Sequence, residues 1–203
     1  MALISNGTTI LDAGAVASGL GASLSVIKKL TASSSANLSF VQGSAGVDFQ
    51  SHKEILFIFT NIHVSNDNTH FGFNASIDAG SNYNVAKTSG VIDCYHGEDG
   101  SGATVEFNGT ASLAQATGIQ RLTNDQGNAN DENVSGYLHI YEASSATFAK
   151  QYIASSSRMS HNDYSAHQMY GGYLNSASDI DAIQFITSAG TIDAGTITMY
   201  GIS

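Results

Sequence analysis

The sequence predicts an all-β protein, a single antiparallel β-sandwich of jelly-roll type with an extended N-terminal arm. The chain has no proline but 21 glycines in 203 residues, so Gly, Ser, Asn and Asp must form its turns. About ten short β-forming runs are separated by turn residues roughly every 8–15 positions, a spacing typical of β-sandwiches. We therefore expect an arm at 1–22 and one β-sandwich domain at 23–203, because this length supports a single sizeable core.

The first segment, Ala2–Ala22, is rich in Ala, Gly and Ser and carries aliphatic residues at no steady period. It predicts an extended arm or a pair of edge strands, and a frayed terminus is the competing interpretation. Aliphatic side chains are costly to leave in water. We therefore expect another chain to cover six interface residues: Leu3, Ile4, Ile10, Leu11, Val16 and Leu20.

The strongest strand signal is Glu54–Val64, which is apolar on both faces and therefore predicts a central strand. Phe71–Ile77 alternates apolar and polar residues, as a half-buried antiparallel strand does. With the polar cluster Ser65–Asn68 between them, the two runs predict a hairpin with a long loop. Two weaker strands precede them, at Ser23–Leu30 and Asn37–Val41.

The rest of the chain predicts further short strands and polar loops, with one helical turn or two at Ala111–Gly118. Near the C-terminus, Asp181–Thr187 and Thr196–Ile202 should be interior strands that lie beside or opposite Glu54–Val64, because they share its apolar character. The remaining predicted strands are Val91–His96, Ala103–Phe107, Gly136–Glu142, Thr147–Ala154 and Ser165–Tyr170, with polar loops at Gly97–Gly102 and Thr123–Asn133.

The charge balance excludes several partners. The net charge is −10, from 7 Lys and Arg against 17 Asp and Glu, which disfavours nucleic acid and anionic lipid. No run approaches the ~18 apolar residues of a membrane span, and no signal peptide is visible at the N-terminus. We expect a protein made in a cytoplasm, and its single cysteine, Cys94, allows no internal disulfide.

Several segments form a recognisable series: EILFIFTNIH (Glu54–His63), SNYNVAK (Ser81–Lys87), Tyr95–His96, LAQATG (Leu113–Gly118), GNAND (Gly127–Asp131), Leu138–His139, DAIQF (Asp181–Phe185) and GTIDAGTITMYGI (Gly190–Ile202). As a series they resemble a family of marine, cyanophage-like bacteriophage virion structural proteins without an assigned role. The resemblance runs from about Leu38 to the C-terminus, and the N-terminal arm has no counterpart. It implies a structural protein of a virion and brings no catalytic motif with it.

Clusters that could carry catalysis or bind metal are weak in this sequence. His63 and His70 lack a third and fourth metal ligand, so we expect His63 to end a strand with an exposed ring and His70 to lie on a loop. Cys94 and His96 share a strand face but stand parallel, ~6.5–7 Å apart, without an oxyanion loop. We therefore expect no enzyme activity, no cofactor and no metal site.

Acidic clusters have simpler explanations. The run Asn124–Asn133 is rich in oxygen ligands but does not match the EF-hand pattern, so a solvated loop is favoured over a Ca²⁺ site. Glu98 and Asp99 could form another weak cation site, and a solvated loop is favoured there too. Asp179, Asp181 and Asp193 could be paired acids of a glycosidase, yet turn formation explains them with fewer assumptions.

The expected function is that of an exterior capsid decoration or cement protein, which binds the major capsid protein or tail components. It should act as a homo-oligomer, with a trimer favoured, on the outer surface of the virion. The alternative is a tail-fibre or spike module that recognises host surface glycan, because aromatic and polar residues next to flexible backbone suit sugar recognition. Its candidate residues are Tyr83, Asp163, Tyr164, Tyr170 and Tyr173.

Overall fold

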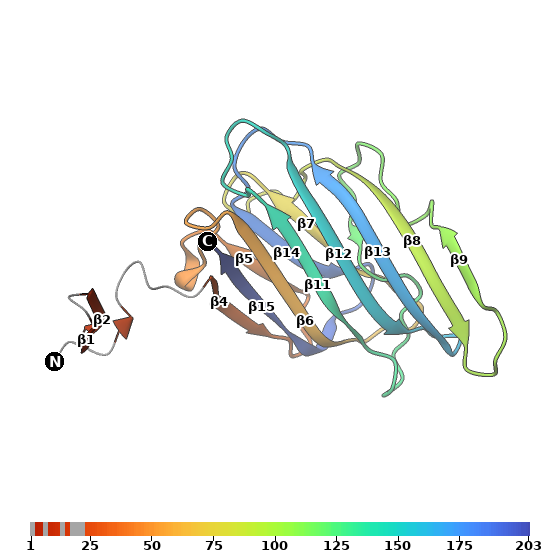
Figure 1. Cartoon of the computed structure of the whole chain (residues 1–203). Coiled ribbons are helices and arrows are strands. Elements are labelled where there is room, and N and C mark those ends of the chain that lie inside the picture. Colours follow the sequence, from red (N-terminus) through yellow and green to blue (C-terminus); the bar gives the residue numbers. More distant parts are fainter. Residues whose placement is uncertain (1–2, 6–7, 13–14, 17–22) are drawn as a thin grey trace.

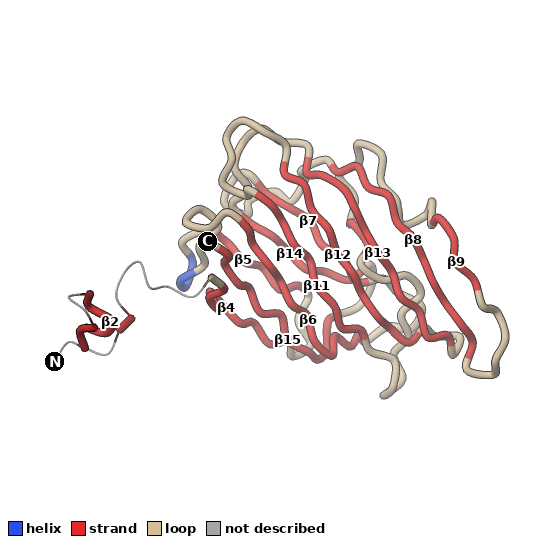
Figure 2. The backbone as a smooth tube through the Cα atoms, viewed as in Figure 1, coloured by secondary structure: helices blue, strands red, loops and turns tan. Residues whose placement is uncertain are grey.

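Two antiparallel sheets packed face to face make up the body of the protein, which confirms the all-β prediction (Figures 1 and 2). The computed structural model describes residues 3–5, 8–12, 15–16 and 23–203. Within these residues the only helical element is a single 3-10 turn, η1 (Ser44–Gly46). None of the described helical residues forms a segment long and apolar enough to cross a bilayer.

The larger layer is an eight-stranded sheet in the order β4-β15-β6-β11-β12-β13-β8-β9. Its middle is a meander, because β11, β12 and β13 follow one another in sequence and pair in space. The strands are β4 (Leu24–Thr31), β6 (Glu54–Val64), β8 (Lys87–Gly97), β9 (Thr104–Phe107), β11 (Val134–Tyr141), β12 (Lys150–Met159), β13 (Tyr164–Leu174) and β15 (Ile192–Ile202).

The smaller layer has four strands in the order β10-β7-β14-β5. Its strands are β5 (Asn37–Val41), β7 (Phe71–Ser76), β10 (Gln120–Arg121) and β14 (Ala182–Thr187). A separate three-stranded sheet at the N-terminus contains β1 (Leu3–Ser5), β2 (Thr8–Asp12) and β3 (Ala15–Val16). Five of the predicted interface residues, Leu3, Ile4, Ile10, Leu11 and Val16, belong to these strands, whereas Leu20 lies outside the described residues.

Aromatic rings from both layers meet in the core. Phe57 of β6 lies with its ring centroid 5.1 Å from that of Phe40 on β5 and 5.3 Å from that of Phe185 on β14. Farther along, Phe59 of β6 meets Phe71 of β7 at 5.5 Å. Edge-to-face pairs of this kind add to the stabilisation that burial of the rings provides. The alternation of side chains along each strand predicts that these residues point inward.

The predicted relation between Glu54–Val64 and the C-terminal segments is confirmed in both of its forms. β15 pairs with β6 in the same sheet, and β14 lies in the opposite layer with Phe185 against Phe57. β14 is itself central, since it pairs with β5 on one side and β7 on the other. Both strands are therefore interior scaffold, as their apolar character indicated.

Two local predictions are wrong. Glu54–Val64 and Phe71–Ile77 do not form a hairpin, because β6 and β7 belong to different layers and touch through their side chains. The polar loop between them carries the chain across the sandwich. Ala111–Gly118 forms no helical turn; instead, its carbonyl groups at Leu113 and Ala116 accept hydrogen bonds from the backbone of β8 at 2.9 and 2.8 Å.

Candidate functional site

A polar pocket of about 320 Å³ opens on the inner face of the eight-stranded sheet, where β8, β9, β12 and β13 meet. Its floor follows from the strand register: Arg158 of β12 pairs with Ala166 of β13, which in turn pairs with Tyr95 of β8. Because Ala166 is small and stands between two large side chains, it leaves room above the sheet. We call this site the Asp93–Arg158 pocket, after the two most buried charged residues that line it.

Asp93 lies two residues before Tyr95 in β8, on the same inner face, and pairs with Gln168 of β13. Its Oδ2 atom accepts hydrogen bonds from Asn108 Nδ2 and Gln168 Nε2, each at 2.9 Å. Its other oxygen, Oδ1, is buried and has no partner among the described residues. Glu106 of β9 pairs directly with Asp93 and also lines the pocket, so two carboxylates stand side by side. Like charges on a cross-strand pair repel each other, so the pairing of Asp93 with Glu106 does not stabilise the sheet.

Arg158 is the cationic group of the pocket. It is 7% exposed, and within the described part of the chain its Nε and Nη1 atoms have no hydrogen-bond partner. Burial lowers the pKa of its guanidinium from the ordinary value, and the charges of Asp93, Tyr170 and Asp125 partly oppose this shift. A guanidinium remains protonated even so. No ion pair shorter than 4.0 Å joins Arg158 to Asp93 among the described residues, so the charge of Asp93 acts on the guanidinium only from a greater distance.

Two tyrosines form an aromatic wall. The rings of Tyr95 and Tyr164 meet edge to face, with centroids 5.6 Å apart and an angle of 88° between their planes. Both residues line the Asp93–Arg158 pocket. Tyr164 is therefore the one predicted glycan-binding residue that the fold brings to this site.

The other predicted glycan-binding residues lie elsewhere. Asp163 lines a neighbouring recess with Glu98 and Asp99, and Tyr173 accepts a hydrogen bond of 2.7 Å from Gln115. Tyr170 is 4% exposed and belongs to the core, where burial raises the pKa of its hydroxyl, so it is not a surface residue.

Tyr83 stands half-buried in the loop after β7, where its hydroxyl lies against Gly80. The five predicted glycan-binding residues therefore do not form one surface.

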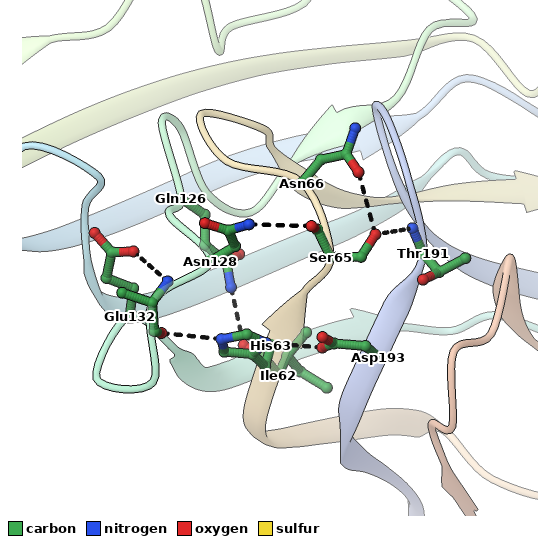
Figure 3. A network of polar contacts seen from close by, with 10 residues as sticks. Ile62, His63, Ser65, Asn66, Gln126, Asn128, Glu132, Thr191 and Asp193 are labelled. Atoms are coloured by element: carbon green, nitrogen blue, oxygen red, sulfur yellow. Dashed lines mark hydrogen bonds and ion pairs between the residues drawn. The ribbon is translucent and has the colours of Figure 1, made fainter.

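His63 lies in a network of hydrogen bonds at the end of β6 (Figure 3). Its Nδ1 atom lies 2.8 Å from Asp193 Oδ1 of β15, and its Nε2 atom lies 2.9 Å from the carbonyl oxygen of Ala129. Burial disfavours the charged ring, but the hydrogen bonds to Asp193 and Ala129 outweigh this effect and raise the pKa of His63. Both ring nitrogens face acceptors, which only the protonated imidazole can satisfy together. The predicted exposed ring is therefore wrong.

The same network anchors the loop Asn124–Asn133. Gln126 is fully buried and donates from Nε2 to the Ile62 carbonyl oxygen at 2.9 Å, while Asn128 donates to the Ser65 carbonyl oxygen at 3.1 Å (Figure 3). Asp125, between these anchors, lines the Asp93–Arg158 pocket. The loop is thus held as a wall of the site by its buried amides, while Asp125 and residues 128–131 are exposed, so the loop is solvated over only part of its length. Buried amides that must hydrogen-bond explain why it is held.

The remaining candidate clusters do not assemble into sites. Within residues 23–203, no group of three His, Cys, Asp or Glu side chains is placed to hold a metal ion. Asp179 accepts a hydrogen bond from Gln50 at 3.0 Å, and Asp181 accepts one from the Ala79 backbone at 2.7 Å, so each links two segments far apart in the sequence. Asp193 lies in β15 and not in a turn. Cys94 and His96 share the outer face of β8, and no hydrogen bond between them occurs in that range.

Sequence reasoning missed the residues at the centre of the pocket. Tyr152, Ala154, Ser156 and Arg158 alternate on the inner face of β12, so a charged residue continues an inward series. The predicted strand ended at Ala154, and Arg158 was left outside it. A charged side chain at inward parity is the signal that could have identified it, since buried charges are rare unless they have a role.

Comparison with protein-family models, with curated proteins and with solved structures found no match.

Proposed function

We propose that this chain is a structural protein of a bacteriophage virion, which decorates the particle's exterior as a symmetric homo-oligomer. The resemblance of the segments between Leu38 and Ile202 to virion proteins supports the class of protein. The observation that carries the mode of action is a row of six uncharged side chains, five of them large and exposed, across the outer face of the eight-stranded sheet. We call it the outer row; it consists of Ile58, Tyr137, Ser155, Met169, Ile92 and Phe107.

Strand register aligns the outer row over six adjacent strands. Tyr137 pairs with Ile58 on one side and with Ser155 on the other. Met169 continues the row by pairing with Ser155 and Ile92, and Ile92 pairs with Phe107. Among the five large side chains exposure rises along the row, from 37% at Ile58 to 68% at Phe107, whereas Ser155 in the middle is polar and half-buried. An exposed strip that is largely apolar over this extent is typical of protein–protein contacts.

For a second copy of the chain, the outer row is the contact surface that charge opposes least. The net charge of −10 makes two copies repel over most of their surfaces. None of the six positions of the outer row carries a formal charge, so two copies can approach there with the least repulsion. Closed rotational symmetry, with a trimer as the favoured number, would bury the row without leaving open ends. The arm at 1–22 supplies a further contact to a neighbour or to the shell.

The jelly-roll assignment belongs to this proposal. The chain passes between the two layers at successive connections, from β4 to β5, from β5 to β6, from β6 to β7 and from β7 to β8. Repeated crossing of this kind supports the wound topology of double-sheet jelly rolls.

The mass of the purified chain in solution, measured by light scattering after size exclusion, tests the assembly. Tyr137→Glu with Met169→Glu places charges in the outer row and should give monomers, while Ser81→Glu with Asn84→Glu adds the same charge on an exposed loop and should leave the oligomer intact. A wild-type monomer, or an oligomer that survives the row variant, would contradict the proposal. An image that locates the chain on an intact particle decides whether it lies on the exterior.

A second candidate function is a receptor-binding module of a tail fibre or spike that recognises host surface glycan. The Asp93–Arg158 pocket favours it, since it combines an aromatic wall with buried polar groups that have no partner in the described part of the chain. Saturable attachment of the purified protein to host cells, abolished by prior removal of surface polysaccharide, is the expected result. Absence of attachment would rule out this function.

A further inference from the structure

The Asp93–Arg158 pocket has the features of a built binding site. Its volume of about 320 Å³ lies at the lower end of the ~300–1,000 Å³ typical of small-molecule sites. Arg158 and Asp93 are each more than nine-tenths buried, and within residues 23–203 the buried atoms Arg158 Nε, Arg158 Nη1 and Asp93 Oδ1 have no hydrogen-bond partner. Buried polar groups in native proteins are almost always hydrogen-bonded, so these atoms indicate a partner that enters from outside the chain.

The two charged groups restrict the chemistry of that partner. Arg158 offers only donors, and Asp93 Oδ1 offers only lone pairs, so a partner that bridges them must accept and donate. A hydroxyl group does both. An anion would satisfy Arg158 but would face the carboxylates of Asp93, Glu106 and Asp125. A metal cation would need several close ligands, and within residues 23–203 no group of three His, Cys, Asp or Glu side chains is placed to supply them, while Arg158 also repels it. A neutral molecule with several hydroxyls is therefore the best match.

The wall of the pocket narrows the class further. Tyr95 and Tyr164 present perpendicular rings, and Asn108 lines the rim beside them. An aromatic ring packs against the C–H face of a sugar, while its hydroxyl and nearby amides bond to the sugar's oxygens.

We infer that the Asp93–Arg158 pocket binds a neutral saccharide ring, with adjacent hydroxyls that bridge Arg158 and Asp93 and an apolar face against Tyr164. The loop Asn124–Asn133, held by Gln126 and by the His63 bonds, closes one side of the pocket. This inference deepens the second candidate function and rests on it for its biological role, but the binding itself does not depend on attachment to a host.

Amide chemical shifts of the purified full-length chain, titrated with single sugars at millimolar concentrations, test the site. The probes are glucose, galactose, mannose and N-acetylglucosamine, with glucuronic acid as the anionic counterpart and glycerol as a small polyol. We expect at least one neutral sugar to cause saturable shifts at Tyr95, Ala166 and the backbone of Asp125, and glucuronic acid to bind more weakly. Glycerol should not saturate, because it lacks a ring face.

Two variants connect binding to the pocket. Arg158→Met removes the donors and Tyr164→Ala removes the aromatic wall, and each should weaken binding at least about tenfold. Tyr83→Ala is the matched control, because Tyr83 is a half-buried tyrosine outside the pocket. If Arg158→Met does not fold, Tyr164→Ala alone decides, since Tyr164 is half-exposed near a strand end.

Several outcomes would overturn the inference: no shift with any neutral sugar, shifts confined to other surfaces, or equal binding by the Tyr164→Ala variant. Tighter binding of glucuronic acid than of every neutral sugar would make the pocket an anion site instead. Sugar binding without attachment to host cells would leave the site valid and rule out the receptor role. Attachment that survives Tyr164→Ala would support the receptor role and reject this pocket as its basis.

Discussion

His63 and Asp193 join the ends of two adjacent strands through a contact of 2.8 Å between Nδ1 and Oδ1. On the other side of the ring, Nε2 lies 2.9 Å from the carbonyl oxygen of Ala129, in the loop that walls the Asp93–Arg158 pocket. One imidazole thus connects β6, β15 and a functional loop. Its protonation state should therefore affect both stability and the loop.

The unfolding free energy should decrease as pH rises above about 6.5, the usual pKa of histidine, because of His63. Its pKa is raised in the folded chain, so the folded state binds the proton more tightly and loses this advantage as pH increases through the folded value. We expect a contribution of about 0.5–1 kcal/mol for such a partly exposed pair.

Denaturant unfolding of wild type and His63→Gln at pH 6 and pH 8 measures this effect. The pKa of His70 is lowered by burial and changes stability in the opposite direction, but His70 is present in both proteins and cancels in the comparison. An equal pH dependence of the two proteins would show that the His63 contacts do not influence folding.

Gly136 should not tolerate alanine. It lies in β11 between two neighbouring strands, and an added Cβ would come within 2.8 Å of Phe59 Cζ and closer still to the Ser155 carbonyl oxygen. Overpacking of this kind costs about 1–3 kcal/mol. Gly171 is the matched control, because an added Cβ there meets nothing within 4 Å, and Gly171→Ala should be neutral or slightly stabilising. Thermal unfolding of the two variants compares them directly; equal melting temperatures would contradict the prediction.

Removal of the Phe185 ring should cost about 3–5 kcal/mol of unfolding free energy. The ring lies in the small sheet and meets Phe40, Phe57 and Phe71 from both layers, so Phe185→Ala leaves a cavity between the sheets. Phe148, which is 73% exposed, provides a control, and Phe148→Ala should change stability by less than about 0.5 kcal/mol. Urea unfolding measures both, and a small loss at Phe185 would mean that the layers do not depend on this contact.

Lys87 should make the chain more stable as pH rises from about 8 to 10. Its amine is fully buried, donates to Asn74 Oδ1 at 3.0 Å and to the Val85 carbonyl oxygen at 3.1 Å, and has a pKa lowered by burial to about 8. In the unfolded chain the amine keeps its proton to about pH 10.4, so the unfolded state binds more protons in this window.

The unfolding free energy of wild type minus that of Lys87→Met should increase by up to about 2 kcal/mol between pH 8 and 9.5. Lys28→Met is the control for a general effect of removing a lysine, because Lys28 lies half-buried on the edge strand β4. A constant difference for Lys87→Met would show that the amine titrates at its ordinary value.

Strand positions were more predictable from the sequence than strand partners. The alternation in Glu54–Val64 identified Phe57 and Phe59 as one face, and these side chains are fully buried. The hairpin with Phe71–Ile77 was wrong because both runs have an apolar inner face, and such faces can pack across two layers as well as beside each other. Nothing local distinguishes these arrangements.

The candidate site shows the same division. The sequence could identify Tyr164 as a candidate glycan-binding residue, because aromatic and polar residues follow one another around it. The sequence could not show that Asp93 and Arg158 lie in one pocket, because 65 positions separate them. Only the pairing of β8, β13 and β12 places them around Ala166. Tyr170 was a candidate on composition alone, and its inward parity on β13 made it a core residue.

By itself, the sequence determined the all-β class and the identity of the interior strands, because side-chain alternation and turn residues act over a few positions. The tertiary structure alone decided which layer each strand joins, and it also placed Asp93, Arg158 and Tyr164 around one pocket. The physical reason is that strand pairing and layer packing bring together residues far apart in the chain. Whether a charge such as Arg158 is buried then depends on what lies across the sheet from it.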